Sequence, residues 1–446
     1  MIKHRYHILM VTLMVTSLML WQVAGLTKVD QRDDVFDLHY TGTDLTIDTS
    51  SSPSVYAFED LNQRLQLFPN DYEARLLKGL LYIQRGKLDT AYQEMHELVK
   101  RAPKFHLAQL VHADLLMSRA STVSDIGSAP LLARLPKKKQ QRLSELRAEA
   151  TVRLNAYLSQ LEGSLLPSEL LLLGPSIKNA VVVDKTRQRL YIYQNQGVGK
   201  PLKLMRDFYV TTGQTSGNKA LRGDLKTPEG VYFITRYIPD AKLPDKYGNG
   251  AFPINYPNAF DKHLGRTGDG IWLHGTGTEH YSRPPKNSEG CVVLTNMELD
   301  ILDKYMEPGT TPVVLTETIS WISEREWSAR RLELMTVLDR WLADWESNDV
   351  ERYLSNYHAD FWSGKLNLRS WSNRKRRVNR GKTYQNIDLK DVSLFSYPST
   401  ASQGKSIVVA SFQQLYRSNN YSGDVRKQLY IVREKGSWKI LYEGRQ

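Results

Sequence analysis

Hydrophobic periodicity changes twice along this chain, and that change constrains the fold more than any other feature. From Asn179 on, short apolar runs such as Ala180–Val183 and Leu190–Tyr193 alternate with Gly- and Pro-rich connections, which is typical of strands. Helical spacing of apolar residues precedes this stretch and returns from Glu324. A chain of 446 residues with such a pattern predicts several domains. We expect a mainly antiparallel β domain over residues 176–318, flanked by helices and by an α+β domain.

A helical domain is predicted over residues 56–165. Pro69 and Pro103 lie 34 residues apart and open similar segments. The small, aromatic and small positions of a 34-residue repeat are occupied by Gly79, Tyr82 and Ala91. The segment resembles one tetratricopeptide repeat and part of a second. Because so few repeats rarely stand alone, we expect a long charged helix over 136–162 to pack against them.

The C-terminal part, residues 324–446, is predicted to be an α+β cone. One helix begins at Glu324 and a second is expected over 349–361. Four strands follow, at 387–397, 406–418, 425–434 and 437–443. Two helices against a curved sheet, closed by the segment Gly436–Ile440 (GSWKI), resemble the nuclear transport factor 2-like (NTF2-like) fold.

The N-terminal 27 residues carry an export pattern. Lys3, His4 and Arg5 precede the apolar run Ile8–Trp21, as in a secretory signal. The uncharged window Ile8–Thr27, about 20 residues long, is near the minimum length of a membrane span, so a cleaved signal and an N-terminal inner-membrane anchor both remain open. Residues 28–55 are polar and are predicted to be a linker. Either way we expect the rest of the chain in the periplasm or cell envelope.

Charge and cysteine usage limit the partners and cofactors. The chain has 60 Lys and Arg against 48 Asp and Glu, a net charge of +12, which favours anionic partners. The basic run 369–382, which contains Trp371, is either a solvated face or a site for an anionic polymer or membrane surface. No nucleic-acid motif accompanies it, and export makes that partner unsuitable. The single cysteine excludes disulfides and multi-cysteine metal sites.

The surroundings of that one cysteine suggest chemistry. Cys291 lies in the segment Ser288–Leu294 (SEGCVVL), and His274 ends the strand-like segment Ile271–His274, 17 residues earlier. An imidazole can deprotonate a thiol and return the proton to a leaving amine. The alternative is a small buried cysteine and a hydrogen-bonded core histidine. His263 and His280 lack metal-ligand spacing with His274, so no metal is expected.

Three motifs in order carry a resemblance to a known family. They are the Thr-Pro-x-Gly turn of Thr227–Tyr232 (TPEGVY), the pair His274-Gly275, and the sequence Ser288-Glu289-Gly290-Cys291. Over residues 176–318 the chain resembles the L,D-transpeptidase catalytic domain of bacterial cell-wall enzymes. The family commonly has histidine where this chain has Glu289, and often arginine where it has Val293.

The resemblance implies a role in cell-wall biogenesis and cell shape, without a cofactor. Cys291 would attack the carbonyl of the third stem-peptide residue of peptidoglycan and expel D-alanine. The predicted supporting roles are proton donor and acceptor for His274, a ring-orienting backbone carbonyl for Gly275, a backbone oxyanion donor for Gly290, and substrate binding for Ser288 and Tyr256.

Three functions remain open at this point. The acyl group on Cys291 could pass to an amine, which is transpeptidation. It could pass to water, as in an L,D-carboxypeptidase or another hydrolase on the same scaffold; the segment Phe252–Phe260 resembles a divergent branch with hydrolytic members. A catalytically silent cell-wall binding scaffold is the third.

Overall fold

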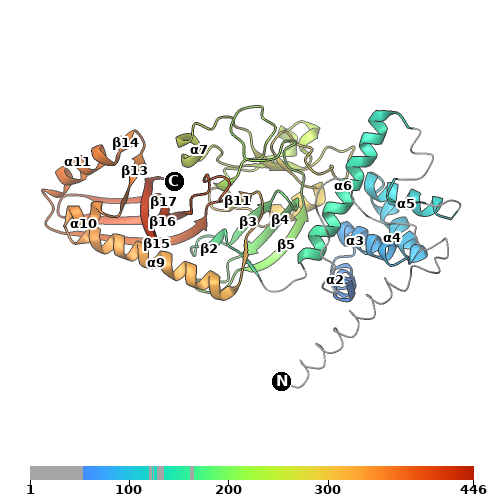
Figure 1. Cartoon of the computed structure of the whole chain (residues 1–446), viewed down its shortest axis with the longest axis horizontal. Coiled ribbons are helices and arrows are strands. Elements are labelled where there is room, and N and C mark those ends of the chain that lie inside the picture. The colour runs from blue at the N-terminus through green and yellow to red at the C-terminus, as the bar shows by residue number, and fades with distance from the viewer. Residues whose placement is uncertain (1–53, 120–122, 124, 128–134, 161–164) are drawn as a thin grey trace, which may run out of the picture. The chain divides into compact units, whose positions relative to one another are not determined.

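The computed structural model divides into two compact units. It describes residues 54–119, 123, 125–127, 135–160 and 165–446 (Figure 1). The first unit runs to residue 163 and includes residues 277–285; the second comprises 164–276 and 286–446. The predicted export segment and nearly all of the linker lie outside the described residues. Among the helices that are described, none has the length and apolar character needed to cross a bilayer.

The first unit is helical, as predicted. Its helices are α2 (Ser54–Leu67), α3 (Tyr72–Gln84), α4 (Leu88–Arg101), α5 (His106–Met117) and α6 (Lys137–Gln160). The turn between α3 and α4 contains Gly86 at a φ of +67°, a conformation that favours glycine. A Cβ on Gly79 would lie 2.2 Å from the terminal methyl of Met95, so a larger residue there would displace the Met95 side chain between α3 and α4. The assignment of these helices to the tetratricopeptide family stays a prediction.

A five-stranded sheet forms the first half of the β domain. Its order is β5-β4-β3-β11-β6, and its strands are β3 (Asn179–Asp184), β4 (Arg189–Gln194), β5 (Lys203–Tyr209), β6 (Gly230–Phe233) and β11 (Pro312–Thr316). Only the β3–β11 pair in this sheet is parallel. Ala180 and Val182 of β3 enter one core while Val181 and Val183 enter another, as the two-residue period of a strand requires.

A second, smaller sheet carries the predicted histidine. Its order is β10-β9-β8-β7, with β7 (Ile238–Pro239), β8 (Gly250–Pro253), β9 (Trp272–His274) and β10 (Val292–Val293). Two short helices accompany it, α7 (Ala259–His263) and α8 (Asn296–Asp303). Strand β10 lies beside β9 in parallel, and β8 lies on its other side in antiparallel. The mainly antiparallel prediction therefore holds, with two parallel pairs.

The C-terminal domain is a seven-stranded sheet with three helices. The sheet order is β14-β13-β18-β17-β16-β15-β2, and the helices are α9 (Glu324–Glu346), α10 (Val350–Leu354) and α11 (Leu368–Asn379). The domain's own strands are β13 (Tyr357–Ser363), β14 (Leu366–Asn367), β15 (Gln385–Ser396), β16 (Ile407–Ser418), β17 (Ser422–Glu434) and β18 (Ser437–Arg445). The sheet ends on β2 (Leu170–Leu172), a strand that precedes the five-stranded sheet along the chain and pairs with β15. Nearby, β1 (Leu166–Pro167) pairs with β12 (Trp321–Ile322).

One sequence prediction in this domain is wrong. We predicted a helix over 349–361, but α10 ends at Leu354 and β13 follows. The side-chain amide of Asn356 donates to Asp344 Oδ2 at 2.8 Å and to the Arg352 carbonyl at 3.2 Å, which closes the helix end. Tyr357 then pairs with Ile440 of β18. Tertiary pairing thus overrides the local helical pattern.

The five-stranded sheet and the C-terminal domain share one apolar core. Val182, Phe233 and Val314 of that sheet belong to the same buried cluster as residues of α9, β15 and β17. Phe260 of α7 lies at the centre of the contact, with its ring 5.1 Å from that of Tyr397 and 5.6 Å from that of Tyr430. These two domains are therefore one packed body.

Candidate active site

His274 is the last residue of β9, held between two neighbouring strands. Only 4% of its surface is exposed. Its ring Nδ1 lies 2.6 Å from the carbonyl oxygen of Gly275. Because a carbonyl can only accept, Nδ1 must carry the proton, and the lone pair of the neutral ring is at Nε2. This tautomer presents Nε2 as the basic nitrogen, which a general base requires.

Residues around His274 hold it from both sides. The ring of Tyr247 meets the imidazole edge-on at 5.0 Å. The Asn296 side chain accepts from the Thr276 amide at 3.1 Å and donates to the Thr276 carbonyl at 2.9 Å. A Cβ on Gly275 would lie 2.1 Å from Asn296 Oδ1, so only glycine fits there. The sequence analysis missed Tyr247 and Asn296, because no spacing connects them to the histidine.

The loop Ser288–Cys291, here called the cysteine loop, is closed by the Ser288 side chain. Its hydroxyl donates to the Cys291 carbonyl at 2.6 Å and accepts from the Gly290 amide at 3.1 Å. Gly290 has a φ of +128°, and a Cβ on it would lie 2.7 Å from the Lys226 carbonyl oxygen. Both the backbone conformation and the close approach therefore require glycine. Ser288 shapes this turn from within, with 4% of its surface exposed.

The placement of Gly290 differs from the role predicted for it. We expected its N–H to bind an oxyanion, but that N–H donates to Ser288 Oγ inside the loop. The prediction overlooked that a serine two residues earlier can fold back and accept this bond. In this conformation the Gly290 amide closes the loop.

Cys291 directly precedes β10 and is partly exposed. Its Sγ lies 3.4 Å from the Gly270 carbonyl oxygen. Val293 pairs with His274 across the parallel strands β10 and β9. Paired residues share a face of a sheet, and so do residues two apart along a strand. Cys291 therefore emerges toward the face on which His274 projects, at the accessible end of β10.

Tyr256 lies in the interior, contrary to its predicted contact with substrate. Only 6% of its surface is exposed, and its hydroxyl donates to the Thr267 carbonyl at 3.1 Å. Its ring packs edge-on against Tyr232 at 5.9 Å, and burial raises its pKa well above the ordinary value. Its burial speaks against direct binding of substrate.

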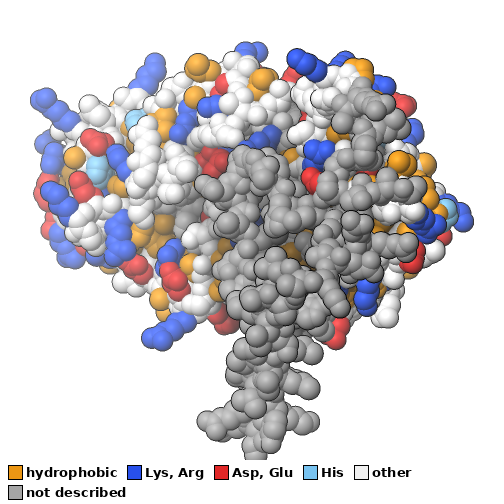
Figure 2. All heavy atoms as spheres, turned by 45° about the vertical axis from the view of Figure 1, so that its right-hand side comes forward, with side chains coloured by type: hydrophobic (Ala, Val, Ile, Leu, Met, Phe, Trp, Pro, Cys, Tyr) orange, Lys and Arg blue, Asp and Glu red, His pale blue; other side chains and the backbone are white. Residues whose placement is uncertain are grey.

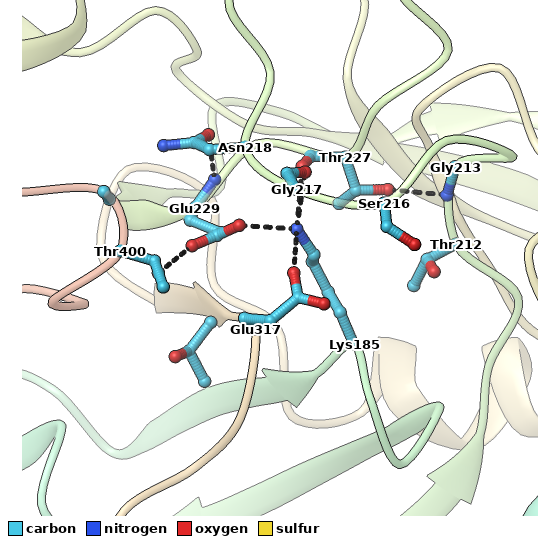
Figure 3. Close-up of polar contacts among 12 residues, drawn as sticks. Lys185, Thr212, Gly213, Ser216, Gly217, Asn218, Thr227, Glu229, Glu317 and Thr400 are labelled. Carbon is cyan, nitrogen blue, oxygen red and sulfur yellow. Dashed lines mark hydrogen bonds and ion pairs between the residues drawn. The ribbon is translucent and has the colours of Figure 1, made fainter. Parts of the chain in front are cut away.

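An ion cluster joins the buried Lys185 to two glutamates, Glu229 and Glu317 (Figure 3). Lys185 Nζ donates to Glu229 at 2.7 Å and to the Gly217 carbonyl at 2.9 Å, and it lies 2.9 Å from Glu317. Glu229 also accepts from Thr400, a residue of the C-terminal domain. The Thr-Pro-x-Gly motif thus supplies a counter-ion to a buried cation. Such a pair is costly to break from one side only.

The loop Thr211–Gly217 lies against the cysteine loop. Gly213 forms a bridge with Ser288, and the Gln214 amide donates to the Ser288 carbonyl at 2.9 Å. The Thr227 hydroxyl accepts from the Gly213 amide at 2.8 Å. A small pocket here is lined by Lys185, Thr212, Gly213, Thr215, Ser216, Thr227, Lys286 and Glu317. The pocket therefore lies behind the cysteine loop.

The other histidines considered with His274 have different surroundings. His263 stacks on Trp362 with ring centroids 3.8 Å apart. His280 meets His106 edge-on at 5.4 Å within the helical unit. Within the described ranges, no group of three or more His, Cys, Asp or Glu side chains is arranged to hold a metal ion.

The basic run 369–382 forms α11 and the turn after it, and part of its charge is used internally. Lys375 Nζ lies 4.4 Å from the ring centroid of Trp371 and 4.5 Å from that of Trp345. Burial lowers the Lys375 pKa to about 8. Arg376 pairs with Glu351 at 2.7 Å. Basic side chains (blue) are interspersed with acidic ones (red) on the face in Figure 2, and Trp371 is a core residue.

The geometry agrees with comparisons to known proteins. The family profile of the L,D-transpeptidase catalytic domain (YkuD) matches residues 178–315, and that of the Cds6 C-terminal NTF2-like domain matches 333–444. The chain carries an L,D-transpeptidase catalytic domain. An NTF2-like domain follows it. The predicted fold class, with helices first, a mainly antiparallel catalytic domain and a final α+β domain, is confirmed.

Individual relatives match one or both of these domains. The chain is 31% identical over 90 residues to YafK of Escherichia coli K12, a protein provisionally named an L,D-transpeptidase. These residues make up 20% of this chain, which spans about a third (32%) of the length of YafK. Bd1075 of Bdellovibrio bacteriovorus is 28% identical with a TM-score of 0.55, covering 63% of this chain and 97% of that one. The helical cell shape determining protein Pgp2 of Campylobacter jejuni is 28% identical with a TM-score of 0.52, covering 62% and 95%.

Proposed function

We propose that this chain modifies peptidoglycan by acyl transfer through a thioester on Cys291. The substrate class follows from the L,D-transpeptidase catalytic domain. The observation that carries the proposal is the parallel pairing of β9 with β10, since it sets His274 and the residues after Cys291 side by side. A partly exposed thiol on that edge, next to a buried imidazole of defined tautomer, is suited to nucleophilic catalysis.

The proposed reaction has two halves. In the first, Cys291 Sγ attacks the carbonyl of the third stem residue while His274 takes the thiol proton. The C–N bond to D-alanine then breaks, and His274 gives the proton to the leaving amine. In the second half an acceptor attacks the thioester and loses its proton to His274, the S–C bond breaks, and the proton returns from His274 to the leaving Cys291 Sγ. The carbonyl of Gly275 holds the imidazole ring through both halves.

The oxyanion donor follows from the loop geometry. The Gly290 amide donates to Ser288 in this conformation, so we assign oxyanion binding to the amide of Cys291 itself. Loss of one such donor from a tetrahedral intermediate costs about 2.7–4 kcal/mol of barrier stabilisation. Ser288 acts by keeping the loop closed, which aims the backbone at the reacting carbonyl.

Two acceptors are compatible with the site. Glu289 is exposed directly before Gly290 and Cys291, and a carboxylate there attracts a cationic amine, which favours transfer. Hydrolysis is the second candidate. It needs no binding site for an amine, because water can reach a thioester on the partly exposed Cys291 directly. With either acceptor the substrate is peptidoglycan, so the proposed location of the enzyme is the periplasm or cell envelope.

Product analysis separates these outcomes. Purified full-length protein is incubated with a stem tetrapeptide, with and without an acceptor amine, and the products are identified by mass spectrometry. A joined product supports transfer, and a shortened tripeptide alone supports hydrolysis. Neither product, together with Cys291 alkylation no faster than that of a model thiol, would favour the binding scaffold.

Two variants control this experiment. Cys291→Ala removes the nucleophile and is expected to abolish both products. His274→Ala is expected to abolish acylation while the thermal unfolding midpoint stays nearly unchanged. A folded His274→Ala protein that still turns over would contradict the assigned role. An anionic polymer at the basic run 369–382 stays a prediction, to be tested by binding with Arg374 and Arg377 replaced.

A further inference from the structure

The chain between the two proposed catalytic residues belongs to the helical unit. His274 and Cys291 lie in the second unit, but residues 277–285 between them group with the first. We call residues 277–285 the connecting segment. A loop that only closed a gap in the sheet would have no reason to join another compact body.

The connecting segment is anchored by the ring of Tyr281. Its centroid lies 4.4 Å from that of Phe105 and 5.8 Å from that of Tyr72. Its amide donates to the Lys104 carbonyl at 3.2 Å, and Lys104 Nζ donates to the Thr278 carbonyl at 2.7 Å. Aromatic pairs of this kind contribute about 0.5–1.5 kcal/mol beyond their buried area.

A second anchor joins the connecting segment to a buried charge network. The Ser282 hydroxyl donates to Glu149 Oε1 at 2.7 Å. Glu149 is 1% exposed and pairs with Arg153 at 2.8 Å, and Arg153 also pairs with Glu73. Burial raises the Glu149 pKa, and the hydrogen bonds from Arg153 and Ser282 oppose that rise by stabilising its charged form. The segment therefore contributes to the polar network of the helical unit's core.

Both ends of the connecting segment are fixed in the catalytic domain. Before it, Thr276 is bonded to Asn296. After it, the Lys286 amide donates to Gln188 at 3.4 Å and Lys286 Nζ to Ser216 at 3.1 Å. Thr276 is two residues from His274, and Lys286 is two residues before Ser288. Because the nine residues run without a break between these two fixed points, a shift of the middle can be passed along the chain to both ends.

We propose that the helical unit positions the active site through the connecting segment, with Tyr281 as the positioning residue. While the Tyr281 ring packs against Phe105 and Tyr72, the turns after His274 and before Cys291 keep the geometry for proton transfer. Release of Tyr281 frees both turns and slows acylation. The expected effect on turnover of stem peptides rests on the proposed function, whereas the expected effect on the reactivity of the Cys291 thiol does not.

The single cysteine makes the test specific, because any thiol-directed reagent reports on Cys291 alone. Iodoacetamide alkylation of the full-length protein is followed as a function of pH. In Tyr281→Ala we expect the rate constant at pH 7 to fall several-fold and its midpoint to move toward that of a free thiol. We also expect kcat on stem tetrapeptide to fall at least tenfold with little change in KM, since a displacement of about 1 Å can cost 100-fold.

Three further variants separate positioning from general damage. Tyr281→Phe keeps the ring contacts and is expected to restore most of the alkylation rate. Tyr82→Ala removes an aromatic pair with Phe58, at 4.7 Å, elsewhere in the helical unit, and is expected to leave Cys291 reactivity unchanged. Lys104→Ala removes the bond to Thr278 from an exposed position and is expected to act in the same direction, more weakly.

The outcomes distinguish the two proposals. Unchanged alkylation and unchanged kcat in Tyr281→Ala and Lys104→Ala would overturn the positioning role. Equal losses in Tyr281→Ala and Tyr82→Ala would also overturn it, since the effect would then be instability of the helical unit. If the wild-type chain has no activity on stem peptides but Tyr281→Ala still shifts alkylation, the proposed function fails and the positioning role stands.

Discussion

The NTF2-like domain and the helical unit hold the catalytic chain by different means. The NTF2-like domain shares an apolar core with the catalytic sheet, and β2 completes its own sheet. The helical unit holds the connecting segment by one aromatic ring and a few hydrogen bonds. A shared core does not open without unfolding, whereas the few side-chain contacts of one short segment can be released by local opening. The first attachment suits permanent architecture and the second suits control.

Truncation of Phe260 is expected to have the largest effect on this comparison. Its ring is 4% exposed and contacts Tyr397, Trp362 and Tyr430 across the shared core. Phe260→Ala should lower the free energy of unfolding by about 3–5 kcal/mol in urea denaturation. Phe68→Ala, at a residue 44% exposed, should change it by less than about 0.5 kcal/mol. A loss under 1 kcal/mol for Phe260→Ala would mean that the two domains pack loosely.

Next in size is the pH dependence of the same body, through Glu169. Burial raises its pKa from 4.5 to about 7, and its Oε1 accepts from the Ser320 amide. The folded state then binds the proton more tightly, so stability is fully present below pH 4.5 and is lost as pH rises to 7. At about 1.4 kcal/mol per tenfold change in proton affinity, the loss is about 3 kcal/mol. Glu169→Gln should remove that slope in denaturation series from pH 4.5 to 7, and an unchanged slope would exclude Glu169 as its source.

A smaller effect is expected at the cysteine loop. Gly290→Ala places a Cβ 2.7 Å from the Lys226 carbonyl at a φ of +128°. Gly265→Ala is the matched control, because its φ is also positive, at +69°, but nothing lies within 4 Å of its Cβ. We expect Gly290→Ala to cost about 1–3 kcal/mol more than the control in thermal unfolding, with loss of acylation. Equal costs would show that the loop can move away from Lys226.

The smallest expected effect is a pH response of the connecting segment, opposite in sign to that of Glu169. Burial lowers the pKa of His106 and of His280, and Arg142 lowers both further; Arg283 also lowers the His280 pKa while Glu279 raises it. Their contribution is present above pH 6.5 and is lost as pH falls below it. Hydrogen exchange of residues 277–285, corrected for intrinsic rates, should quicken between pH 7 and 5. His280→Asn should reduce that change, and an undiminished change in this variant would place its source elsewhere.

Much of the architecture could be predicted from periodicity and short motifs. The strand pair at 180–183 and 190–193, the helix from Glu324 and the four late strands all lie where the local pattern places them. The pairing of β2 with β15 could not be predicted, because it joins residues more than 200 positions apart. The predicted helix over 349–361 failed for the same reason, since Tyr357 is drawn into the sheet by β18.

The candidate site divides in the same way. His274, Gly275, Ser288 and Cys291 were found because their spacing along the chain is itself the signal. Tyr247 and Asn296 were missed, since their contacts with His274 and Thr276 arise only when separate segments meet. The oxyanion role predicted for the Gly290 amide is not supported in this conformation, because that amide donates to Ser288. Local sequence thus identifies reactive groups better than the groups that orient them.

Intact-protein mass spectrometry of a covalent intermediate tests the central claim most directly. The full-length chain is mixed with stem tetrapeptide and quenched in acid at short times. We predict an added tripeptide acyl group with release of D-alanine, mapped to Cys291 and absent in Cys291→Ala. An adduct on another residue, or D-alanine release by Cys291→Ala at the wild-type rate, would contradict the account.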